Sequence, residues 1–131
     1  MPKPAVPLED DEQIAFVAWC EDRELKLSAI PNSTYTPHHS VKARNHRLGL
    51  RPGFPDLVVL IQPDQSRDGE GYFLCIEMKR TKGSSTSDDQ KAWLAAINGL
   101  GCLNVQSYVA KGAHEAQSIV RHYLKHDRVE F

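Results

Sequence analysis

Two stretches decide the fold: GFPDLVVLI at residues 53–61 and YFLCIEMK at residues 72–79. Both contain apolar runs rich in β-branched or aromatic residues and are bounded by proline, glycine or polar residues, a pattern that predicts buried strands. The segment between them, residues 63–71, is polar and contains Asp68-Gly69, which favours a turn. The two strands are therefore predicted to pair as a hairpin.

The position of the turn determines which residues of the hairpin oppose each other. In an antiparallel pair, the residue numbers of opposed positions have a constant sum. A turn centred near Arg67 places Asp56 opposite the region of Glu77 and Met78, whereas a bulge would shift this register. Side chains alternate along a strand, so Glu77 and Lys79 share one face. The pattern thus permits Asp56 to lie beside Glu77 and Lys79.

Further helices and strands are predicted on both sides of the hairpin. Apolar residues recur at helical spacing in three segments, and SDDQ at residues 87–90 has the capping-box pattern that begins a helix. A short fourth helix is predicted from Ser40 as its cap and Gly49 past its end. The order predicts an α/β domain with a small mixed sheet flanked by helices. The predicted helices span about residues 8–23, 40–48, 87–100 and 112–125, and the additional strands span about residues 25–30 and 103–109.

Length and composition are typical of one soluble globular domain. The chain has 131 residues, of which 40% are hydrophobic and 25% charged. Residues 1–7 contain three prolines and are predicted to be a flexible lead, which leaves 8–131 as a single domain. No signal peptide and no membrane span are predicted, because no apolar run has the required length.

The cysteines predict a reducing compartment. Cys20, Cys75 and Cys102 each lie in an apolar stretch, and none belongs to a C-x-x-C pair. An odd number of cysteines, spread along the chain, predicts buried, reduced thiols in the cytosol and argues against a structural zinc site.

The charge balance requires any nucleic-acid partner to be bound by a local patch. The formal net charge is −1, so no global basic field is present. Cations gather before Asp56 and directly after the second strand, where they are either a solvated face or phosphate contacts. The candidate DNA-binding residues are Lys42, Arg44, Arg47, Arg51, Arg80 and Lys82.

Two carboxylates and an ammonium at one end of a hairpin are groups suited to metal-dependent chemistry on a phosphate. Asp56 and Glu77 offer the hard oxygen ligands that Mg²⁺ and Mn²⁺ prefer. A divalent cation there would activate water and offset charge on a phosphate. Lys79 would orient or deprotonate that water, or stabilise the transition state. The structural alternative is that Asp56 starts a strand and that Glu77 and Lys79 form a surface pair.

The sequence resembles a known nuclease family at these residues. Pro55-Asp56, a strand and then Glu77-Met78-Lys79 resemble the PD-(D/E)XK superfamily. GFPDL at 53–57, IEMK at 76–79 and SDDQ at 87–90, followed by Trp93-Leu94, are similar to the VRR-NUC family over about residues 11–125. The resemblance implies a restriction-endonuclease-like fold close to the Holliday junction resolvases. Many members are stand-alone bacteriophage or bacterial nucleases, which implies a location in the cytoplasm of a bacterial or infected host cell.

The resemblance also implies roles for residues of the strand ends. Asp56, Glu77 and the main-chain carbonyl of Met78 would be metal ligands, and Lys79 would be the catalytic lysine. Stand-alone members are dimers that act on branched DNA such as four-way junctions. The implied function is therefore that of an Mg²⁺- or Mn²⁺-dependent DNA endonuclease, structure-selective and homodimeric.

Two residues on helices complete the candidate site. The family's helical glutamine corresponds to Gln90, which the capping box also explains, and its first-helix glutamate corresponds to Glu12. Glu12 is thus a candidate catalytic residue and metal ligand, although an acidic first turn is also favoured by the helix dipole. Trp93 is predicted to be a core residue rather than a platform for a stacked base.

Two other functions stay open at this level. A non-catalytic nucleic-acid-binding module with a degenerate site is one, and the intact set of Asp56, Glu77 and Lys79 argues against it. An RNA-directed nuclease is the other, because a metal site of this kind does not read the sugar.

Overall fold

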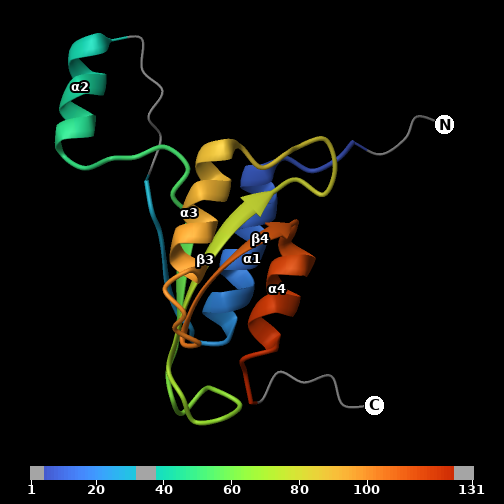
Figure 1. The fold of residues 1–131 in the computed structure, drawn as a ribbon. Helices are drawn as coiled ribbons and strands as arrows, with labels where there is room; N and C mark the ends of the chain where they lie inside the picture. The colour runs from blue at the N-terminus through green and yellow to red at the C-terminus, as the bar shows by residue number, and fades with distance from the viewer. Residues whose placement is uncertain (1–4, 32–37, 126–131) are drawn as a thin grey trace.

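Four strands form one mixed sheet in the order β1-β2-β3-β4 within the residues that the computed structural model describes, 5–31 and 38–125 (Figure 1). The strands β1 to β3 are antiparallel neighbours, and β4 is parallel to β3. This arrangement confirms the predicted α/β class with a mixed sheet. The elements are α1 (Glu9–Asp22), β1 (Lys26–Ala29), α2 (His39–Arg47), β2 (Leu57–Ile61), β3 (Tyr72–Lys79), α3 (Asp88–Asn98), β4 (Val105–Lys111) and α4 (Ala113–Arg121).

The central hairpin has the register that the turn composition indicated. The paired residues run from Leu57 opposite Ile76 to Ile61 opposite Tyr72, without a bulge. Continuing the register by one residue brings Asp56 opposite Glu77. Both residues lie at the end of the hairpin away from the turn, which is where the candidate site was predicted.

One face of the sheet carries the hydrophobic core. The inward-facing residues of β2 and β3 are almost completely buried there, and α1 and α4 cover them. From α1, Phe16 and Cys20 are fully buried and confirm the predicted stripe of that helix. The largest strand residues of this core are Leu57, Val59, Ile61, Leu74, Ile76 and Met78.

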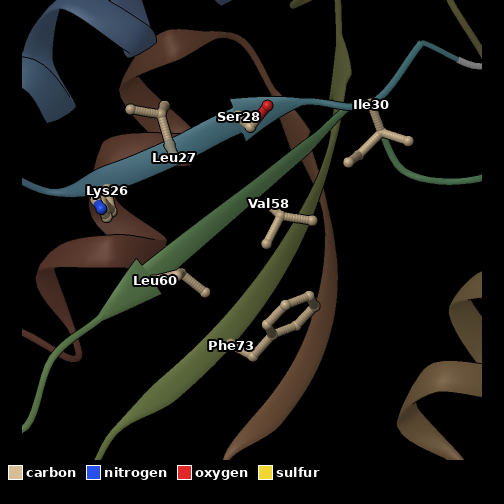
Figure 2. Close-up of a pocket in the computed structure, with 7 residues that line it drawn as sticks. All are labelled: Lys26, Leu27, Ser28, Ile30, Val58, Leu60 and Phe73. Carbon is tan, nitrogen blue, oxygen red and sulfur yellow. The ribbon is translucent and has the colours of Figure 1, made fainter.

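The other face is covered by α3 beside β4 and is open over β1 and β2. Asn98 of α3 fixes this packing, because its side chain bonds both the N–H and the carbonyl oxygen of Ser107 in β4. Figure 2 shows Ile30, Val58 and Phe73 on the open part of this face. They line a cavity of about 400 Å³, and Phe73 is 41% exposed.

Several sequence-based expectations differ from the structure in detail. Cys20 and Cys75 are buried as predicted, but Cys102 is exposed. The prediction that Trp93 belongs to the core is wrong, because α3 buries none of its residues completely. Strand β4 begins at Val105, and Leu103, predicted to be in it, is 81% exposed.

Two further predictions concerned a flexible N-terminal lead and the absence of a membrane-spanning segment. Residues 1–4 of the predicted flexible lead lie outside the described residues, and residues 5–8 form neither helix nor strand. Within the described part of the chain, no helix combines the length and the apolar character needed to cross a membrane.

Candidate active site

The start of β2, the end of β3 and the first turn of α3 bring the predicted residues together. Asp56 precedes β2, and its Oδ2 accepts a hydrogen bond of 2.7 Å from the N–H of Met78. Glu77 and Lys79 project from the same face of β3, and Lys79 Nζ lies 3.8 Å from Glu77 Oε1. The structure therefore places Asp56, Glu77 and Lys79 in one cluster, which the predicted register permitted.

Two charged groups of this cluster, those of Glu77 and Lys79, are buried, which a surface ion pair would not be. Glu77 is 5% exposed and Lys79 is 7% exposed. Taking such groups out of water is costly unless each finds partners. This burial argues against the alternative of a pair on a solvated edge strand.

Gln90 connects the two charged groups of β3 through its side-chain amide. Its Nε2 donates to Glu77 Oε1 at 2.5 Å, and its Oε1 accepts from Lys79 Nζ at 2.7 Å. The same Oε1 accepts from the N–H of Ser87 at 2.9 Å, and the Ser87 hydroxyl accepts from the N–H of Gln90, which closes the capping box. Gln90 therefore serves the helix start and the cluster at once, and the helix start fixes which way its amide points.

Burial and mutual repulsion disfavour ionisation of the carboxyl groups. Burial, followed by the negative charge of Asp56, raises the pKa of Glu77 to about 8 from its ordinary value of 4.5. Burial also raises the pKa of Asp56, against the effect of the hydrogen bond from Met78. In the absence of a cation, the two carboxyl groups therefore hold a proton more tightly than free carboxyl groups do.

The residues present fit a divalent cation. Glu77 Oε2 is buried and accepts no hydrogen bond from any described residue. A buried carboxylate oxygen without a hydrogen-bond donor has lost its contacts with water, which is costly unless a bound cation compensates for them. Asp56, which lies opposite Glu77, supplies a second carboxylate as a ligand for a cation. The carbonyl of Met78, the residue between Glu77 and Lys79, is the predicted third ligand.

The first helix contributes acidic residues near the cluster. The described hydrogen bond of Glu12 is to α4: its Oε2 accepts a 2.6 Å hydrogen bond from the N–H of Ala113. The α1 carboxylates whose charges act on the cluster are Glu9 and Asp10. Burial, followed by the charge of Asp56, raises the pKa of Glu9. The sequence did not distinguish Glu9 from Glu12, because all four residues from 9 to 12 are acidic. Glu9 and Glu12 are also one helical turn apart, so periodicity places both on the same side of the helix.

The loop that carries Asp56 is held against α3 by a close backbone approach. Gly53 has φ +89°, and a Cβ atom there would lie 2.6 Å from the carbonyl carbon of Asp89 and 2.7 Å from the nitrogen of Gln90. One turn further along α3, Trp93 Nε1 donates to the carbonyl oxygen of Pro52 at 3.1 Å. The loop is thus fixed to the helix that supplies Gln90. In the sequence, the glycine of the GFPDL motif was the only sign of this close approach.

Substituting Gly53 tests this attachment. Gly53→Ala is expected to reduce the cleavage rate by about 10- to 100-fold, because displacing reacting groups by about 1 Å has effects of that size. Gly49→Ala is the matched control, since Gly49 has φ +99° and open space around its Cβ position. The comparison of single-turnover rates separates the clash from the strain that both variants share. Equal rates for the two variants would show that the close approach does not position the site.

Three of the candidate DNA contacts form a free cationic surface on α2. This helix has no buried residue and stands away from the sheet (Figure 1). Lys42, Arg44 and Arg47 form no ion pair with any residue of the described part. Arg51, which follows α2, instead donates to the carbonyl oxygens of His46 at 2.7 Å and Leu50 at 2.9 Å.

The two candidate contacts after β3 differ from each other. Arg80 is half-buried, and its Nη2 donates to the carbonyl oxygen of Val6 at 3.4 Å. Lys82 is exposed in the loop before α3. Of the six predicted DNA contacts, Lys42, Arg44, Arg47 and Lys82 are therefore the most accessible to a phosphate backbone.

The raised pKa of Glu77 predicts how stability depends on pH in metal-free protein. Between about pH 4.5 and pH 8 the unfolded chain ionises Glu77 while the folded chain keeps it protonated, so the free energy of unfolding falls as pH rises. The Mn²⁺ affinity is expected to rise over the same range, because the ligand must lose its proton. Urea unfolding of the wild type and of Glu77→Gln, which cannot titrate, isolates this contribution. A difference between them that does not change with pH would contradict the raised pKa.

Comparison with known proteins identifies the family. Residues 6–114 match the VRR-NUC domain. A solved structure described as a VRR_NUC domain protein has the same fold, with a TM-score of 0.68 and 23% sequence identity over 95% of this chain and 92% of that one. No curated protein matches the sequence. Because the match to the domain covers most of the sequence, the chain belongs to the VRR-NUC family and carries a nuclease-type domain.

Proposed function

We propose that this domain is an Mg²⁺- or Mn²⁺-dependent endonuclease that hydrolyses phosphodiester bonds in DNA. The observation that carries the proposal is half-buried Asp56 beside buried Glu77 and Lys79, with one Glu77 oxygen that accepts no hydrogen bond from the described residues. Titratable groups with shifted pKa values and a specific charge partner gather at functional sites. Asp56, Glu77 and the carbonyl of Met78 would hold the cation.

A bound divalent cation supplies a Lewis acid that activates water and offsets negative charge on the phosphate. The chain's own residues position the other groups. Gln90 Oε1 holds Lys79 Nζ, so the ammonium has one fixed direction before substrate binds. From there Nζ can donate a proton of its ammonium group in a hydrogen bond to a phosphate oxygen as charge builds there. Gln90 Nε2 keeps Glu77 turned toward the same point.

The proposed substrate is DNA, bound by the cationic surface of α2. Phosphate neutralisation by lysine and arginine supplies most of the sequence-independent affinity for a nucleic acid. Lys42, Arg44 and Arg47 lie on α2, and the chain from α2 leads directly into the loop that carries Asp56 (Figure 1). A strand held by α2 would therefore approach the cluster.

Charge removal on α2 is expected to weaken DNA binding without unfolding the protein. Lys42→Ala, Arg44→Ala and Arg47→Ala should each lower the affinity for all DNA sequences alike and reduce the slope of log K against log salt by about 1. The fold should survive because α2 buries nothing. Arg67→Ala is the control, since Arg67 is exposed in the turn at the opposite end of the hairpin. Salt titrations of binding, in EDTA, provide the measurement, and an unchanged slope in all three variants would exclude α2 as the phosphate contact.

Branched DNA and a homodimer form the finer part of the proposal. Two copies related by a two-fold axis would present two sites, which suits paired cuts at a symmetric four-way junction. A panel of duplex, flap, fork and four-way junction, each incubated with Mg²⁺, Mn²⁺ or EDTA, tests this part. We expect metal-dependent cleavage of the junction in preference to the duplex. Junction binding without cleavage at any Mn²⁺ concentration would instead support a non-catalytic module, and preferential cleavage of the RNA counterparts would support an RNA-directed nuclease.

A further inference from the structure

A second cavity lies beside the candidate active site, between the loop that carries Asp56 and the helix that carries Gln90. Its volume is about 270 Å³. Its walls include Ile30, Leu50, Arg51, Phe54 and Trp93, and it is called the aromatic pocket below. The predicted hydrophobic core does not account for it, because its aromatic residues are only partly buried.

Three walls of the aromatic pocket are attached directly to residues of the cluster. Phe54 precedes Asp56 by two residues, which limits their separation to about 7 Å along the chain. The N–H of Ile30 donates to the carbonyl oxygen of Asp56 at 2.8 Å. Trp93 follows Gln90 by three residues on α3, so the two lie on neighbouring turns of the same helix side. The pocket and the cluster are therefore adjacent parts of one surface.

The aromatic groups of the pocket are held in place before any ligand binds. The Phe54 and Trp93 rings meet edge to face, with centroids 5.0 Å apart. The Trp93 indole is also anchored by its hydrogen bond to Pro52. Arg51 is fixed by the carbonyl oxygens of His46 and Leu50, and it adds a guanidinium to the rim. Partly exposed rings beside a guanidinium form the kind of platform on which nucleobases stack.

We propose that the aromatic pocket binds one unpaired nucleobase of the DNA strand, next to the phosphate at the cluster. The cationic α2 precedes the pocket in the chain. The phosphate backbone of the DNA would therefore bind α2, and a base of the same strand would bind the aromatic pocket. A base inside a duplex is stacked and paired and cannot enter without being extruded. The pocket thus gives the domain a preference for DNA with unpaired or splayed bases. This inference rests on the proposed DNA substrate and names the feature of that substrate that is recognised.

The test compares oligonucleotides that differ only in their bases. Binding of a fluorescein-labelled oligothymidylate and of an abasic oligomer of the same length is measured by anisotropy in EDTA, so that no cleavage takes place. We expect the wild type to bind the base-bearing oligomer about tenfold more tightly, because one stacked base contributes an effect of that order. Trp93→Leu should remove this difference and leave abasic binding unchanged, whereas Trp93→Phe, which keeps a ring but loses the bond to Pro52, should retain most of it.

A second readout does not depend on the folding of any variant. Stacking on Trp93 should quench the tryptophan fluorescence of the wild type when the base-bearing oligomer binds, and the abasic oligomer should not do so. Equal affinities and equal quenching for the two oligomers would overturn the aromatic pocket as a base site, as would a Trp93→Leu loss that is the same for both. Failure to bind either oligomer would overturn the proposed DNA substrate as well. Junction cleavage without base discrimination would overturn the pocket alone.

Discussion

Lys79→Ala is expected to lower the single-turnover rate of DNA cleavage by about 10²- to 10³-fold, the usual cost of losing one group that stabilises the transition state. Lys79 is buried, its Nζ is held by Gln90, and Nζ lies within 4 Å of Glu77 Oε1. Its removal also leaves the Glu77 carboxyl without its nearest cation. Single-turnover measurement at saturating protein separates the chemical step from DNA binding.

Lys125→Ala is the matched control for this substitution. Lys125 carries the same charge but is exposed at the opposite end of the sheet, beside the hairpin turn. It should cleave at the wild-type rate. Wild-type cleavage by a folded Lys79→Ala protein would show that the lysine acts only as a partner for Glu77 in the fold.

Phe16→Ala is expected to destabilise the protein by about 3–5 kcal/mol, the range for deleting a fully buried phenylalanine side chain. Phe16 is 0% exposed, packs on Trp19 with ring centroids 6.1 Å apart, and belongs to the core that joins α1 to the sheet. A domain of this size has about 5–15 kcal/mol of stability in total. The variant should therefore unfold at a much lower urea concentration, with an unchanged m value.

Phe73→Ala removes the same side chain from the open face of the sheet. Phe73 is 41% exposed, so we expect a loss of only about 1 kcal/mol, near the average for point substitutions. Comparable losses for the two phenylalanines would contradict the assignment of the core to the face covered by α1 and α4.

Much of the hairpin and its cluster follows from sequence alone. The alternation of side chains places Glu77 and Lys79 on one face of β3, whatever the rest of the fold does. The polar turn then brings Asp56 opposite Glu77, and the observed register agrees. Gln90 was identifiable because the SDDQ pattern has both a capping function and a family counterpart. These features depend on neighbours in sequence or on one short turn.

The features that sequence did not reveal depend on contacts between distant segments. The charges of Glu9 and Asp10 act on the cluster while Glu12 binds Ala113, because α1 lies against α4 in one orientation. The close approach of Gly53 to α3 and the partial exposure of Trp93 likewise follow from how the loop and the helix pack. No local pattern encodes such a distance, because periodicity describes a single element and not its neighbour.

The most direct test of the central claim, that Asp56 and Glu77 form a metal-dependent catalytic site, is cleavage of a four-way junction by the wild type and by Glu77→Gln in Mn²⁺ and in EDTA. The glutamine keeps the size of the side chain and removes its negative charge. We expect cleavage only by the wild type, and only with Mn²⁺, together with loss of Mn²⁺ binding by the variant in calorimetry. Cleavage in EDTA, or cleavage by Glu77→Gln at the wild-type rate, would contradict the account.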